Sequence, residues 1–121
     1  MATNLSVDSF NLTPSDCEIE ILLDGRALER LPCHKRILSI SSVLNAAQSL
    51  MTDDTLNIRL RSEDEVMAFK DLIHFFYNDN LDHVEQTEEA MLRLMNMADQ
   101  YGSSICMLAV MEHPLVSADN F

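Results

Sequence analysis

Cys33 and His34 form the one adjacent thiol and imidazole pair in this chain, and such a pair could serve a thiol hydrolase. That chemistry needs the general base within hydrogen-bond reach of the thiol, with a third group holding the base in place. Consecutive side chains normally diverge, and the sequence has no glycine-rich loop. We therefore predict a protein that is not an enzyme, with a buried thiol beside a helix-starting histidine. A Cys-His thiol hydrolase remains the catalytic alternative.

Metal chemistry is disfavoured by the spacing of the remaining candidate ligands. His74, His83 and His113 are spread along the chain, and none is three or four residues from another His or Cys. The acidic clusters at residues 53–54 and 63–65 lack the D-x-D-x-D-G pattern that aims several oxygens at one cation. We expect neither a metal nor a cofactor.

Composition and charge further restrict the class of protein, its cellular location and its partners. The 121 residues suffice for one domain, and 47% of them are apolar. There is no apolar run near the roughly 20 residues that cross a bilayer and no N-terminal leader, so no membrane association and a cytoplasmic or nuclear location are expected. The three cysteines lack C-x-x-C spacing, so we predict that they are reduced thiols in the core. The net charge of −12 disfavours nucleic acid and would attract a basic partner, although acidic surfaces more often serve only solubility.

Local patterns predict the order of strands and helices. Alternation predicts a strand over 17–23, Asp24-Gly25 predicts a tight hairpin turn, and a second strand should return through Leu28 and Leu31. Residues 34–50 predict two short helices divided by serines, with inward contacts from Ile37, Leu38, Ile40, Leu44, Ala47 and Leu50. A third strand is predicted over 55–60.

The remainder of the chain is predicted to be helical. Ser62 and Glu65 form a capping box, and the helix that follows carries a thick apolar stripe from Val66 to Tyr77. Another helix should begin near Thr87 and stop at Gly102, and a last, strongly apolar helix should run over 103–112. Its methionines and those of the preceding helix are assigned to the core, namely Met91, Met95, Met107 and Met111. The pattern indicates an α+β fold.

Four short motifs, in order, resemble the BTB/POZ family. They are Ser15-Asp16, the His34-Lys35 pair within Pro-Cys-His-Lys-Arg-Ile-Leu-Ser (32–39), the helix from Ala68-Phe69 to Phe75-Phe76-Tyr77, and Ala98-Asp99-Gln100-Tyr101-Gly102. The resemblance implies a small three-stranded mixed sheet covered by five to six helices. It implies a domain over residues 15–113, between a flexible arm (1–14) and a tail (114–121). It also implies a protein-protein interaction module.

The resemblance also suggests where a partner would bind. Members that recruit a cullin-type ubiquitin ligase scaffold carry a hydrophobic-x-Glu motif, and Met51-Thr52-Asp53 is the nearest match, with Leu50 as a second candidate for the apolar position. The alternative is a plain acidic turn before the third strand. We assign partner binding to Leu50, Met51, Asp53, Asp54, Tyr77 and Asn78, where Tyr77 is either a surface anchor or a locally satisfied buried phenol. Some members hold a charged pocket, which here would use Asp16 and Lys35.

Departures from the family pattern bear on assembly. The gap from Gly25 to His34 is longer than usual and should lengthen or bulge the second strand. Many members pair as homodimers through an amphipathic helix ahead of the first strand, and no such pattern precedes Asp16. A homodimer by that route is not expected. Self-association, as in the transcriptional regulators and channel-type proteins of the family, remains the alternative to an adaptor.

Overall fold

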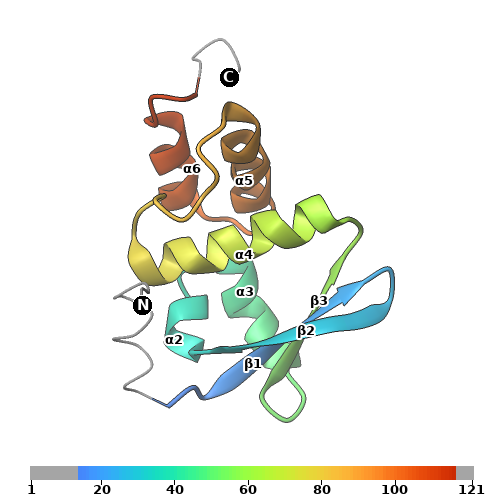
Figure 1. Ribbon diagram of the computed structural model, residues 1–121. Coiled ribbons are helices and arrows are strands. Elements are labelled where there is room, and N and C mark those ends of the chain that lie inside the picture. Colours follow the sequence, from blue (N-terminus) through green and yellow to red (C-terminus); the bar gives the residue numbers. More distant parts are fainter. Residues whose placement is uncertain (1–13, 117–121) are drawn as a thin grey trace.

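The computed structural model describes residues 14–116 as a three-stranded sheet with helices stacked against it (Figure 1). The predicted arm and tail lie outside this range, apart from Pro14 and residues 114–116. None of the helices in the described range has the length and apolar character needed to span a membrane. The elements are β1 (Cys17–Leu23), β2 (Arg26–Cys33), α2 (Lys35–Leu38), α3 (Ser42–Ala47), the 3₁₀ turn η1 (Gln48–Leu50), β3 (Thr55–Leu60), α4 (Glu63–Asn78), α5 (Glu88–Gln100) and α6 (Ser104–Met111).

The sheet is mixed, as predicted, with the strand order β2-β1-β3. β1 pairs antiparallel with β2 and parallel with β3. Asp24 and Gly25 take positive φ values of 52° and 80°, the conformation that a two-residue hairpin turn requires. The register shifts between Ile21, opposite Glu29, and Leu22, opposite Ala27. β2 therefore contains the expected bulge, at Leu28.

α4 is the central helix of the fold. In Figure 1 it crosses the middle of the molecule, with the sheet, α2 and α3 on one side and α5 and α6 on the other. Most of its predicted stripe is buried, with Phe69 and Leu72 fully inaccessible, and Tyr77 at its end is partly buried. Ala68 and Phe75, on the flanks of the stripe, are also buried. Burial on more than one side is what a helix between two layers needs.

Serine and threonine side chains cap α3, α4, α5 and α6, with one difference from prediction. The Ser62 hydroxyl accepts from the Glu65 N–H at 3.2 Å, as a capping box requires. The Glu65 carboxylate, however, accepts from the N–H of Arg61 at 2.6 Å rather than from Ser62. The reciprocal bond therefore falls one residue earlier, because the chain leaves β3 in a tight bend directly before the helix.

Three residues predicted to face inward are exposed, namely Ile40, Leu50 and Met111. Ile40 lies in the turn between α2 and α3, where the helical spacing is interrupted. Leu50 ends a 3₁₀ turn, whose three-residue period rotates the chain away from the face that Leu44 occupies. α6 buries only one side. The prediction from its apolar composition therefore assigned too many of its residues to the core.

Candidate functional site

The segment between η1 and β3 forms a small hairpin of its own. Asp53 and Asp54 both take left-handed backbone angles, with φ of 52° and 57°. On either side of them the Thr52 N–H donates to the Thr55 carbonyl at 3.2 Å, and the Thr55 N–H donates to the Thr52 carbonyl at 2.9 Å. Two positive-φ residues between a bonded pair make a tight turn, and Asp tolerates this conformation better than most residues. Two carboxylates are thus fixed at the tip.

Leu50 is displayed directly before this turn. Its side chain is 78% exposed, whereas Met51 is half-buried against the core. η1 is tied down by Gln48, whose side-chain amide donates to the Lys35 carbonyl at 2.9 Å and to the Ser39 hydroxyl at 3.0 Å. An apolar side chain held out from a tethered segment is a pre-organised contact for another protein.

Asp16, Lys35 and Asp54 meet at the base of the turn. The Lys35 N–H donates to Asp16 Oδ1 at 2.8 Å, and its ammonium group donates to Asp54 Oδ1 at 2.8 Å. The bond to Asp54 raises the pKa of Lys35. The Asp54 carbonyl in turn accepts from the Glu18 N–H at 2.9 Å, which ties the turn to β1. The two residues of the predicted charged pocket are therefore neighbours, but the ion pair joins Lys35 to Asp54 rather than to Asp16.

Asp53 differs from Asp54 in this respect. Within residues 14–116 no ion pair involves Asp53, and its side chain is exposed. Leu50 and Asp53 are thus the apolar and acidic groups of this segment that are most accessible to a partner.

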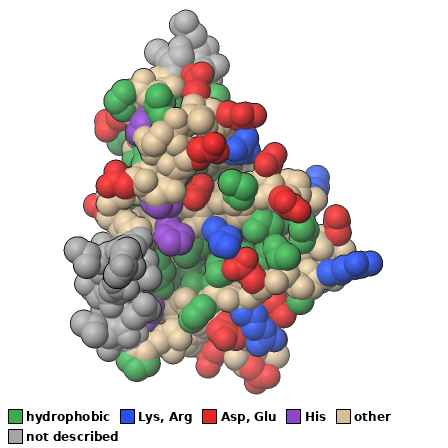
Figure 2. All heavy atoms as spheres, viewed as in Figure 1, with side chains coloured by type: hydrophobic (Ala, Val, Ile, Leu, Met, Phe, Trp, Pro, Cys, Tyr) green, Lys and Arg blue, Asp and Glu red, His purple; other side chains and the backbone are tan. Residues whose placement is uncertain are grey.

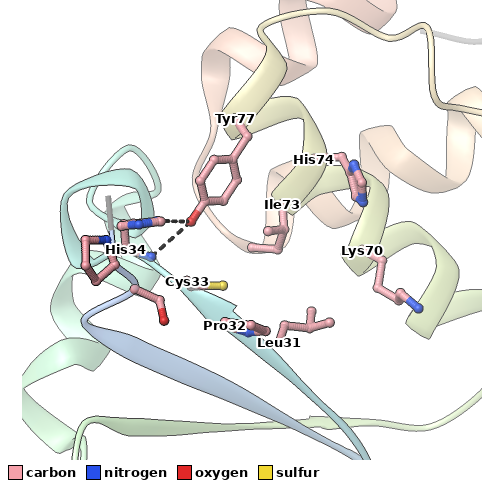
Figure 3. A pocket seen from close by; sticks show the side chains of 10 residues that line it. Leu31, Pro32, Cys33, His34, Lys70, Ile73, His74 and Tyr77 are labelled. Carbon is pink, nitrogen blue, oxygen red and sulfur yellow. Dashed lines mark hydrogen bonds between the residues drawn. The ribbon is translucent and has the colours of Figure 1, made fainter. Parts of the chain in front are cut away.

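Tyr77 lies inside a pocket rather than at an exposed helix end. Its hydroxyl accepts from the His34 backbone N–H at 3.0 Å and bonds the imidazole Nδ1 at 2.8 Å (Figure 3). Burial raises the pKa of Tyr77. Asn78 is partly buried, and its side-chain oxygen has no hydrogen-bond partner among the described residues. Tyr77 is linked to the turn indirectly, through His34 and the adjacent Lys35, whose ammonium group bonds Asp54.

The pocket that contains Tyr77 has a volume of about 430 Å³, and no sequence pattern predicted it. Its lining is mainly apolar, and the side chains labelled in Figure 3 come from the end of β2 with the next residue and from α4: Leu31, Pro32, Cys33, His34, Lys70, Ile73, His74 and Tyr77. Pro14 and Ser15, ahead of β1, complete the lining. The two halves of this lining are some forty residues apart in the chain, so only the tertiary fold creates the pocket.

The same pocket bears on the hydrolase alternative. Cys33 is buried, and burial raises the pKa of its thiol to about 12. The reactive form of a cysteine is the thiolate, which is scarce at neutral pH when the pKa is this high. The neighbouring imidazole is turned to Tyr77. The arrangement does not supply an activated nucleophile.

Two histidines that the sequence left apart lie against each other. The rings of His74, on α4, and His83, in the α4–α5 connection, stack with their centroids 5.1 Å apart. His83 Nε2 bonds the Asp71 carbonyl at 2.8 Å. Burial lowers the pKa of both imidazoles. In the described part of the chain, no three His, Cys, Asp or Glu side chains converge as a metal site would require.

The mixed sheet, the helix pair that follows β2 and the stack of α4, α5 and α6 together define the BTB fold. Among solved structures, the chain is similar to the BTB (Tramtrack and Bric a brac) domain of human gigaxonin, with a TM-score of 0.61 and 19% identity. The match covers 93% of this chain and 95% of that one. No family model and no curated protein matches the sequence. The predicted BTB-like α+β fold is confirmed.

Proposed function

We propose that this chain is a non-catalytic protein-protein interaction module that recruits a cullin-type ubiquitin ligase scaffold through the segment from Leu50 to Asp54. The observation that carries the proposal is the display of Leu50 and Asp53 on a backbone that hydrogen bonds hold in place. Hot spots in protein interfaces are apolar anchors surrounded by polar groups that fix orientation. A cytoplasmic or nuclear location would follow from such a partner.

The exposed fractions distinguish between the two candidate apolar positions. Met51 is already half-buried in its own domain, so it has less surface to offer, whereas most of Leu50 is free. We therefore assign the anchor to Leu50 and the orienting acid to Asp53. The ion pair between Lys35 and Asp54 would act on binding only by holding the turn, because exposed ion pairs contribute little energy by themselves.

The test is a calorimetric titration of the purified chain with the N-terminal region of a cullin. We expect a Kd of about 10 µM or tighter. Leu50→Lys and Asp53→Lys should each weaken binding by roughly tenfold or more. The matched control is Met67→Lys on α4, where a 50% exposed side chain lies away from the turn. A wild-type chain that shows no heat at about 100 µM, or a control that loses binding equally, excludes the scaffold assignment.

Self-association is the second candidate function, and one observation favours it. β2 is an outer strand of the sheet, and no strand within residues 14–116 pairs with its far side. The mainly apolar pocket opens beside it. Outer strands and adjoining apolar hollows are common places for two copies to join. Light scattering from micromolar to millimolar concentrations tests this candidate, and a constant monomer mass would exclude it.

A further inference from the structure

α6 carries an apolar stripe that faces away from the core. Ile105, Leu108 and Met111 are 60%, 57% and 45% exposed, and their spacing of three residues puts them along one side of the helix. The opposite side holds Cys106 and Val110, which are fully buried. Within the described chain this face is therefore only partly covered.

A groove of about 470 Å³ runs beside this stripe. The buried side chains of Phe75 and Leu81 contribute apolar surface to it, and Ile105 and Leu108 line it from α6. Its other lining residues include three acids, Asp79, Asp82 and Glu112, and no Lys or Arg. Apolar surface bordered by carboxylates suits a ligand that combines apolar and cationic groups.

The charged residues are unevenly distributed along the chain, and acids predominate in the half that forms this groove. From residue 71 to residue 121 there is one Lys or Arg, Arg93, against nine acids, whereas the other seven Lys and Arg fall between residues 26 and 70. Arg93 is itself paired with Glu89 at 3.4 Å. In Figure 2 apolar side chains lie close to acidic ones at the upper left of the molecule, in the region of α6. This end of the molecule should attract cations at long range.

We propose that this groove binds a cationic amphipathic helix of a partner protein. The partner would set apolar side chains with a spacing of three or four residues against the α6 stripe and would place Lys or Arg opposite Asp79, Asp82 and Glu112. α6 has eight residues and is therefore about 12 Å long, which matches roughly two turns of a partner helix.

Charge argues against the other occupants of an apolar groove. A second copy of the chain would bring its own acidic rim against this one, in molecules that each carry a net charge of −12. Acidic peptides and anionic lipid surfaces would be repelled for the same reason. α6 also lies at the opposite end of the molecule from the green loop that holds the Leu50–Asp54 segment (Figure 1), so binding in this groove does not depend on the proposed cullin binding.

The test uses fluorescence anisotropy with a labelled 16-residue helical peptide, with leucines at a three- or four-residue spacing and lysines on the flanks. A matched peptide carries glutamate in place of every lysine. We expect the cationic peptide to bind at least tenfold more tightly than the acidic one, and its affinity to fall as salt is raised. Equal affinities for the two peptides, or no binding of either, would overturn the proposal.

Variants locate the binding site on the folded chain. Leu108→Ser removes an exposed apolar contact, and Asp82→Asn combined with Glu112→Gln removes two rim charges; each should weaken peptide binding by roughly fivefold or more. Met67→Ser and Glu63→Gln are the matched controls away from the groove, and they should leave binding unchanged. Controls that weaken binding as much as the groove variants would show nonspecific charge attraction and reject the site. A dimer that dissociates on Leu108→Ser would assign the groove to a second copy instead.

Discussion

Ser41 joins two halves of the fold through one buried hydroxyl, and replacing it by alanine gives a sharp stability prediction. The hydroxyl accepts from the Leu44 N–H at 3.0 Å, which caps α3, and donates to the Tyr101 carbonyl at 2.5 Å, at the junction of α5 and α6. The Ser41 side chain is fully inaccessible to solvent. Ser41→Ala therefore removes a cap and a tertiary bond together.

The magnitude follows from these two losses. Losing an N-cap hydroxyl costs about 1 kcal/mol of unfolding free energy. Depriving the Tyr101 carbonyl of its main donor costs about 1 kcal/mol more, because only a long contact of 3.5 Å from the Val43 N–H remains. We expect Ser41→Ala to lower the unfolding free energy by about 2 kcal/mol. Ser62→Ala is the matched control, since Ser62 is an exposed cap whose hydroxyl, among residues 14–116, bonds only the Glu65 N–H, and it should lose about 1 kcal/mol.

The assay is urea unfolding of both variants and the wild type, followed by circular dichroism. Equal slopes against denaturant would show that the unfolded state is unchanged, so that the midpoints report stability. If the two serine variants lose the same free energy within error, the bond to Tyr101 adds nothing to the cap, and the argument for a structural link between α3 and the α5–α6 junction fails.

Three further predictions concern strain, reactivity and pH. Gly102 and Gly25 both have positive φ, but a Cβ on Gly102 would collide with the Ser42 hydroxyl, whereas a Cβ on Gly25 would meet no atom within 4 Å. Gly102→Ala should therefore lower the unfolding free energy by at least about 0.5 kcal/mol more than Gly25→Ala in the same urea assay. Equal losses for the two variants would contradict this prediction. Because burial raises the pKa of the Cys33 thiol, iodoacetamide should label Cys33 in the folded protein at least tenfold more slowly than free cysteine at pH 7.5. Mass spectrometry measures the labelling rate, and rapid labelling would support the hydrolase alternative. Burial raises the pKa of the Asp71 carboxyl group to about 6 in the folded state. The folded state therefore binds the Asp71 proton more tightly than the unfolded state does, and the stabilisation from this protonation is lost as the pH rises through 6. Asp71→Asn should therefore gain roughly 1 kcal/mol relative to wild type between pH 5 and pH 7.5, and a difference independent of pH would refute the burial argument.

Local sequence patterns predicted most of the strands, turns and helix caps. The alternation in β1, the Asp24-Gly25 turn and the Ser62 cap each follow from interactions within a few residues, and all three are present in the structure. The bulge in β2 was predictable from the length of the gap before His34. Inward contacts failed at Ile40 and Leu50, because helical spacing does not continue through a turn or into a 3₁₀ segment.

The candidate site was less accessible to sequence reasoning because its contacts are long-range. The family resemblance suggested a charged pocket with Asp16 and Lys35, but it could not show that the Lys35 ammonium group reaches Asp54, which depends on β3 lying beside β1. Tyr77 and His34 are separated by 43 residues, and only the packing of α4 on the sheet brings them together. The exposed side of α6 could not be predicted from its composition, since Ser104 at its start is the one polar side chain of this otherwise apolar helix and does not mark a solvent face along its length.

The most direct test of the central claim is nuclear magnetic resonance mapping of the isotopically labelled chain during titration with the cullin N-terminal region. We expect the amide signals of residues 50–55 to shift or broaden first, while those of α6 and of the hairpin at Asp24-Gly25 stay in place. Shifts confined to residues outside 50–55, or none at about 100 µM partner, would contradict the claim that this turn is the surface that grips another protein.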